Sequence, residues 1–378
     1  MSGSKQSTPK IPRVVTFDIM RGFFLIAIVI NHIYFFPNML DWLGMRGQLM
    51  VSTAEGFFFL SGLVLGLVRG AKLVSEPFKK VTKLVLKRTF QLLITYAVLV
   101  IVFTAIAWYL YPGVDGVKNG VMAEHSWWRL IIDTFTLQYT YGWADYLRFY
   151  VMFLAVTPLA LWLLRKKLWY IVLALSVLIW YLSPVDHTTM SWTTIQIYQP
   201  IPWQLLFFSG MIIGFHWPDI AAWWQRHKQL LVRYVAWPIA IIGVATLCFN
   251  VFTVFAQEFI ASDWARHLAE ETKRLRTTTF YKEELPLVRY LLFLLWFWAA
   301  FFIIERFQKQ IIRFTGWLLI PFGVNSLYVY TLHAVLVFFV HIYFSSTNIV
   351  GNFLVTAGVI AIIYAAIRTK FLMNIIPR

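Results

Sequence analysis

Four polar side chains lie in one apolar segment near the N-terminus, residues 15–36: Asp18, Arg21, Asn31 and His32. In an α-helix, the eleven positions from Arg21 to His32 turn the chain by about 1,100°, about 20° past three full turns. The two side chains therefore share a helix face, about 16 Å apart along the axis, and Asp18 lies about 40° away. A guanidinium on this face suits phosphate or carboxylate, and an imidazole in a partly dry cavity can act as a general base toward a hydroxyl.

Each of these residues also has a structural interpretation. Arg21 could pair with Asp18 where the chain enters the membrane, and His32 could make a hydrogen bond between helices. An ionisable group at membrane depth is nevertheless a functional candidate, because burying charge in lipid is costly.

The next apolar segment, residues 48–68, places Glu55 near its outer end, at a depth similar to that of His32. A carboxylate there could orient the imidazole and stabilise its protonated form, and the alternative is an acid at the membrane surface. Ser61, Gly62 and Gly66 form a small-residue face in the same segment. That face favours close helix packing, and it could also leave a slot for a thin ligand.

Later segments add polar groups at similar depths. Asp145 and Arg148 are three positions apart and can pair, while His333 is either a site residue or one half of an interhelical hydrogen bond. Trp203 begins a segment in which Gly210 and Gly214 are spaced for packing. The candidate catalytic residues are His32, Arg21 and Glu55, and the candidate substrate- or cofactor-binding residues are Asp18, Asn31, Ser61, Arg148, Trp203, Asn325, Tyr328 and His333.

The composition requires a membrane to position these groups. The chain has 378 residues, of which 60% are apolar and 13% charged, against about 45–50% and about 25% in soluble domains. These values exclude a soluble enzyme, a disordered protein and a disulfide scaffold, and the continuous apolar runs argue against a β-barrel. The sequence lacks a Walker A motif and an H-E-x-x-H motif, so ATP-driven work and a metal site are not indicated.

Hydropathy predicts an all-α polytopic bundle of about ten transmembrane helices. The expected spans are residues 15–36, 48–68, 89–111, 146–164, 168–184, 200–217, 231–255, 287–304, 317–344 and 350–367, the ninth being long and kinked near Gly323. With the N-terminus inside, about two thirds of the 33 lysines and arginines fall on the cytoplasmic side. Both termini are therefore expected in the cytoplasm. The net charge of +16 then reflects topology, and a nucleic-acid partner is not expected.

No linker divides the chain, so residues 1–378 form one expected domain with a cytoplasmic tail at 1–13. Two segments outside the membrane are unusual, the tryptophan-bearing 112–145 and the charged 256–286. Residues 256–286 are either a solvated cap with i,i+4 charge pairs or a face for a polar extracytoplasmic substrate.

Several of these segments together resemble a known family. The D-x-x-R-G-x(8)-N-H pattern that contains Arg21 and His32 looks like the acyltransferase type three superfamily of membrane proteins. The stretches that follow it are similar in order and spacing to the OpgC-type branch: AEGFFFLSGLVLG, RFYVMFLAVTPLALWLL, PIPWQLLFFSGMIIG and FGVNSLYVYTLH. That branch is associated with succinylation of periplasmic glucans, and the resemblance spans about residues 13–344.

The resemblance implies a multi-pass protein of the bacterial inner membrane with a cytoplasmic acyl-CoA donor, succinyl-CoA or acetyl-CoA, and no permanently bound cofactor. It implies an extracytoplasmic glycan as acceptor and carries over Arg21 and His32 as the pair essential for activity. The other expected partner is the lipid bilayer, and a homo-oligomer is left open. The residues of segment 256–286 match nothing in the pattern.

The residues and the resemblance together predict an O-acyltransferase. The thioester would lie near His32, which would deprotonate a sugar hydroxyl, while Glu55 holds the imidazole and Tyr328 or Asn31 supports the oxyanion. Direct transfer and an acyl-histidine intermediate both fit, as do O- and N-acylation. A transporter or flippase of a glycan or lipid is the alternative function, since it too would need buried Arg and His.

Overall fold

The computed structural model describes residues 13–110, 127–183 and 200–376, and all regular structure in these ranges is helical. Most of the expected tail 1–13 and part of the expected outer segment 112–145 lie outside the described residues. The main helices are α1 (Val15–Ile33), α2 (Asp41–Gly44), α3 (Thr53–Leu65), α4 (Phe78–Leu110), α5 (Trp127–Phe135), α6 (Asp145–Arg165), α7 (Trp169–Leu182), α8 (Pro200–Phe215), α9 (Trp217–Arg226), α10 (Lys228–Leu231), α11 (Trp237–Phe259), α12 (Asp263–Thr278), α13 (Leu287–Arg306), α14 (Gln308–Val324), α15 (Ser326–Tyr343) and α16 (Ile349–Thr369).

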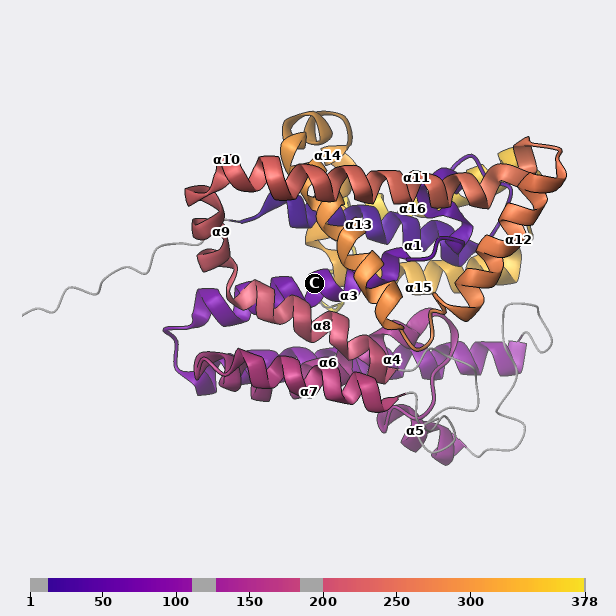
Figure 1. Cartoon of the computed structure of the whole chain (residues 1–378). Helices are drawn as coiled ribbons and strands as arrows, with labels where there is room; N and C mark the ends of the chain where they lie inside the picture. The colour runs from indigo at the N-terminus through magenta and orange to yellow at the C-terminus, as the bar shows by residue number, and fades with distance from the viewer. Residues whose placement is uncertain (1–12, 111–126, 184–199, 377–378) are drawn as a thin grey trace, which may run out of the picture.

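The long helices run side by side, with α9 at one end of the bundle and α5 and α12 at the other (Figure 1). Within the described residues, eight helices are long and apolar enough to span a membrane, or nine if α8 and α9, bent by 62°, form one broken span. The expected all-helical, multi-span bundle is thus confirmed, with eight or nine spans in the part of the chain that the structure describes. The segment expected at 168–184 is the 14-residue helix α7, which rises only about 21 Å against the roughly 30 Å of a bilayer core.

The expected ninth span, 317–344, is two helices that meet at Asn325. Asn325 has non-helical dihedral angles, and its side chain donates a hydrogen bond to the carbonyl of Pro321 at 2.9 Å. Pro321 lacks the N–H that would continue the α14 ladder, which favours a change of direction here. The break gives α15 a direction of its own, and α15 carries His333.

Helices α3 and α8 cross in direct backbone contact. A Cβ atom on Gly62 would lie 1.9 Å from the carbonyl oxygen of Phe207, and one on Gly214 would lie 1.8 Å from that of Leu63. Gly66 and Gly210 are equally tight against the opposite helix. The expected small-residue packing is thus confirmed. The other interpretation was a slot for a thin ligand, but the α8 backbone occupies that space.

A second crossing of this kind joins α1 to α14. A Cβ atom on Gly22 would lie 2.0 Å from the carbonyl oxygen of Leu319, and one on Gly323 would lie 1.8 Å from that of Asp18. Gly22 directly follows Arg21 in the sequence. The glycine in the D-x-x-R-G pattern therefore fixes the helix that presents the arginine.

The α3–α8 crossing predicts a large loss of stability in Gly62→Ala. The added methyl group meets backbone, which cannot rotate away, so we expect a loss of about 1–3 kcal/mol or more. The matched control is Gly358→Ala in α16, where an added Cβ has no neighbour within 4 Å. Thermal unfolding in detergent measures both. Equal midpoints for the two variants would contradict the crossing.

Candidate functional site

Two histidines from distant parts of the chain meet inside the bundle. His32 Nδ1 on α1 and His333 Nε2 on α15 are 2.8 Å apart, and the other ring nitrogen of His333 lies 2.9 Å from the carbonyl oxygen of Tyr330. His333 is buried, with 1% of its surface exposed, whereas His32 keeps part of its surface accessible. Nε2 of His32 makes no hydrogen bond within the described residues and is not a buried atom, so a ligand can reach it.

Aromatic rings hold the imidazole of His32 in place. Trp143 stacks on it with ring centres 4.7 Å apart and an interplanar angle of 23°, and Tyr146 of α6 lies 6.3 Å away. His341 donates from Nε2 to the backbone carbonyl of His32 at 3.0 Å. The sequence interpretation did not select Trp143, Tyr146 or His341, because nothing local links them to α1. The His32 ring thus has a fixed orientation and an apolar wall.

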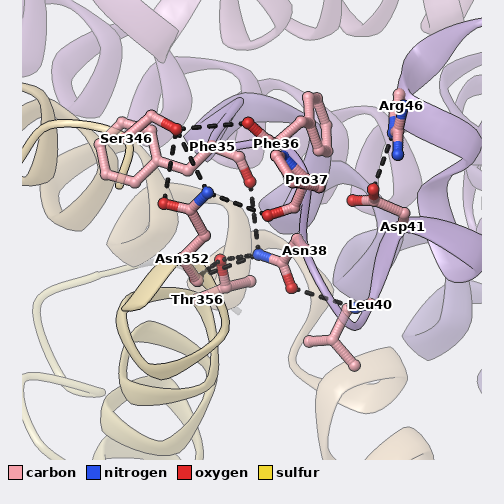
Figure 2. Close-up of polar contacts among 10 residues, drawn as sticks. All are labelled: Phe35, Phe36, Pro37, Asn38, Leu40, Asp41, Arg46, Ser346, Asn352 and Thr356. Atoms are coloured by element: carbon pink, nitrogen blue, oxygen red, sulfur yellow. Dashed lines mark hydrogen bonds and ion pairs between the residues drawn. The ribbon is translucent and has the colours of Figure 1, made fainter. Parts of the chain in front are cut away.

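The chain just after His32 is clamped by the start of α16 (Figure 2). Asn38 donates to the Thr356 hydroxyl at 2.8 Å and to the Asn352 carbonyl at 3.1 Å. Asn352 in turn donates to the carbonyl of Pro37 at 2.9 Å. Both asparagines are buried with their amide groups satisfied, so the loop at residues 34–40 is held rigidly against α16.

Positive charge gathers at the His32 end of the bundle. Lys282, between α12 and α13, lies over the ring of the fully buried Trp203 at 5.9 Å, close enough to His32 and Asp145 for the charges to interact. Arg276 of α12 is near Arg289 and Tyr34, and burial first and the Arg289 charge second lower its pKa. These cations favour a negatively charged group above His32.

Arg21 lies toward the opposite end of α1, and it does not pair with Asp18. Asp18 accepts instead from Arg13 Nε at 2.5 Å. The Arg21 guanidinium lies beside the Tyr150 hydroxyl of α6, and its Nε atom is buried without a partner among the described residues. Arg88 lies close enough to Arg21 and Arg69 for all three charges to interact, so this region is strongly positive.

Tyr146 and Tyr150 are four residues apart on α6, so they share one face of that helix. Tyr146 lies beside His32 and Tyr150 beside Arg21. The predicted common face of Arg21 and His32 on α1 therefore looks toward one face of α6.

The role expected for Glu55 needs correction. Glu55 is fully buried and forms an ion pair with Arg289 of α13, whose Nε donates to it at 2.6 Å. Its other oxygen accepts from the backbone N–H and hydroxyl of Ser52, which makes a capping box at the start of α3. The carboxylate is thus bound by Arg289 and Ser52 rather than by His32. The S-x-x-E spacing at 52–55 was the sequence signal for the capping box.

Two other candidates, Asn31 and Tyr328, donate hydrogen bonds to backbone carbonyls. Asn31 donates to the Gly44 carbonyl at 3.1 Å and lines a mostly apolar cavity of about 200 Å³ between α1, α3, α11 and α13. Tyr328 donates to the Phe371 carbonyl at 2.6 Å. The Tyr328 hydroxyl hydrogen is thus used by a backbone carbonyl, as is one N–H of Asn31, whose Oδ1 is buried without a partner among the described residues.

Ser61 is buried in α3 one residue before the α8 crossing, and Arg148 is buried close to Asp145 and the Tyr96 hydroxyl. Among the described residues, no three His, Cys, Asp or Glu side chains group in a way that could hold a metal ion.

Comparison with known protein families gives one match, to the model described as OpgC protein, over residues 13–374. This chain belongs to the OpgC family. No curated protein and no solved structure matches it. The OpgC model covers nearly the whole helical bundle, including both histidines and both glycine crossings. Membership indicates a glucan-modifying acyltransferase, and the apolar helices make it a multi-pass membrane protein.

The corrected role of Glu55 predicts that Glu55→Gln harms stability rather than chemistry. Removing the carboxylate leaves the Arg289 charge buried and uncompensated. We therefore expect the free energy of unfolding to fall by about 3–5 kcal/mol. Acyl transfer per folded molecule should persist. The measurements are the thermal midpoint in detergent and the specific activity of the folded fraction.

The matched control is Glu271→Gln, which removes an exposed ion pair with Arg274 and should leave the midpoint unchanged. A Glu55→Gln protein with a normal midpoint and no activity would restore Glu55 to the catalytic role.

Proposed function

We propose that this OpgC protein transfers a succinyl group from cytoplasmic succinyl-CoA to a hydroxyl of an extracytoplasmic glucan, in the inner membrane of a bacterium. The observation that carries the proposal is the shared α1–α6 face. A reachable imidazole lies at one end of that face and a group of arginines at the other. The axial distance of about 16 Å between Arg21 and His32 suits the long, thin phosphopantetheine arm of coenzyme A.

The arginines supply the donor end of the site. Phosphate and pyrophosphate groups carry several negative charges, and guanidinium groups bind them in a bidentate manner. Arg21 has a buried Nε without a described partner, and Arg69 and Arg88 lie within electrostatic range. In our proposal, the phosphates of succinyl-CoA neutralise this group while the thioester extends toward His32.

His32 supplies the chemistry at the acceptor end. Its free Nε2 takes the proton of a glucan hydroxyl as the oxygen attacks the thioester carbonyl. The new acyl C–O bond forms and the C–S bond breaks, and His32 returns the proton to the departing thiolate. The rings of Trp143 and Tyr146 exclude water from one side of the imidazole, which protects the thioester from hydrolysis.

Lys282 favours succinyl over acetyl as the acyl group. The acyl group of a succinyl thioester ends in a carboxylate at its fourth carbon, whereas an acetyl group carries no charge. Lys282 and Arg276 put positive charge at that end of the site. A charge-assisted hydrogen bond from Lys282 would therefore distinguish the two donors.

The direct test of the proposed function is His32→Ala. Loss of the general base should lower the transfer rate by about 10²–10⁴-fold, while the protein still inserts and folds. The measurement is mass spectrometry of glucan incubated with succinyl-CoA and proteoliposomes. The matched control is His227→Ala, an exposed histidine on the α9–α10 connection, which should transfer at the wild-type rate. Undiminished transfer by the folded His32 variant would refute the assignment.

A second prediction concerns the acyl group. We expect wild-type protein to have a lower kcat/KM for acetyl-CoA than for succinyl-CoA. Lys282→Met should lower kcat/KM for succinyl-CoA about tenfold or more and leave kcat/KM for acetyl-CoA unchanged. Lys273→Met on the exposed face of α12 is the control and should change neither. Equal losses with both donors would show that Lys282 supports the fold instead of selecting the carboxylate.

A further inference from the structure

The contacts of His333 determine which of its nitrogens carries the proton. Its Nδ1 lies 2.9 Å from the carbonyl oxygen of Tyr330. A carbonyl oxygen only accepts hydrogen bonds, so Nδ1 must be the donor and must carry a hydrogen. The position of the proton on His333 is thus set by the Tyr330 carbonyl, a backbone group of the same helix that cannot rotate away.

The charge of His333 settles its second nitrogen. The ring is 1% exposed and its described contacts are the Tyr330 carbonyl, the Tyr330 ring and the His32 ring. An imidazolium there would be a buried charge without a carboxylate among those contacts, which is costly. His333 is therefore neutral, and with Nδ1 protonated its Nε2 is an acceptor.

The same argument passes to His32. Its Nδ1 is 2.8 Å from His333 Nε2, so His32 Nδ1 must donate. The remaining nitrogen of a neutral His32, Nε2, then bears the free electron pair. This is the tautomer that histidine in water disfavours, and the fold imposes it through the carbonyl of Tyr330.

We infer that His333 is a positioning residue that fixes His32 in the Nδ1–H tautomer, so that Nε2 is the basic atom. The inference rests on the proposed function, since it assigns the atom that performs the proton transfer. The glucan hydroxyl gives its proton to His32 Nε2, the acyl carbon exchanges sulfur for oxygen, and the same proton leaves with the thiolate. The Nδ1 proton stays between the two rings throughout.

His341 provides a built-in comparison. Its Nε2 lies 3.0 Å from the backbone carbonyl of His32, so by the same reasoning this nitrogen carries a hydrogen. It supports the His32 backbone but makes no hydrogen bond to the ring nitrogens. A change at His341 therefore disturbs the surroundings of His32 without removing the acceptor for Nδ1–H.

The kinetic test compares three variants. His333→Leu removes the acceptor and should lower kcat by about 10–100-fold or more, with KM for succinyl-CoA within twofold of wild type. His333→Gln offers a carbonyl oxygen to the same proton and should recover much of kcat. His341→Gln, which keeps a donor for the His32 carbonyl, should lower kcat much less than His333→Leu does. A His333→Leu protein that folds and keeps wild-type kcat, or a His333→Gln protein no better than His333→Leu, overturns the positioning role.

The second readout does not depend on activity. Nitrogen-15 NMR of ring-labelled histidine in lipid nanodiscs, with His32→Ala to assign the signal, should show a proton on Nδ1 of His32. In His333→Leu the signal should move toward the Nε2–H form. An Nε2–H tautomer for His32 in the wild-type protein overturns the inference. A wild-type protein with the Nδ1–H tautomer and no acyl transfer overturns the proposed function alone.

Discussion

The hydrogen bond between two imidazoles at membrane depth constrains this structure more than any other contact. It joins residues 301 positions apart in the sequence, so α1 and α15 must each be placed to within a few tenths of an ångström. The glycine crossing of α1 and α14 fixes one helix, and the break at Asn325 sets the direction of the other. Glycines and a helix break, which take no part in proton transfer, thus position the two histidines.

The two ends of α1 have opposite local requirements. Near Arg21 the surrounding groups are arginines and a tyrosine hydroxyl, which leave a positive field to be neutralised by whatever binds. Near His32 the nearest neighbours are aromatic rings and the imidazole of His333, and Lys282 lies within electrostatic range. A single helix thereby connects a region suited to phosphate with a region suited to a reactive ester.

Helical periodicity and residue size predicted much of this arrangement. The common face of Arg21 and His32 follows from 3.6 residues per turn, and the crossing of α3 and α8 follows from glycines spaced four apart. Both patterns are local in the sequence. Hydropathy also predicted the all-helical membrane fold, but it does not show that α7 has 14 residues or that a helix breaks at Asn325.

Contacts between segments far apart in the sequence could not be predicted from the sequence. Glu55 was matched to His32 by depth alone, whereas its partner Arg289 lies 234 residues away in the sequence. His341 and Trp143 reach His32 only because α15 and the start of α6 pack there. Depth along a helix restricts which residues can meet, but the rotation and neighbours of each helix decide which of them do.

The contacts of Arg289 also restrict how the connection between α12 and α13 can move. Besides Glu55, its guanidinium donates to the carbonyl of Phe280 at 2.6 Å, so the connection between α12 and α13 is tethered to the interior at its base. Swinging that connection outward would strip the guanidinium of a backbone acceptor while it stays enclosed. Under the proposed function, a sugar chain would therefore enter beside this anchored connection instead of displacing it.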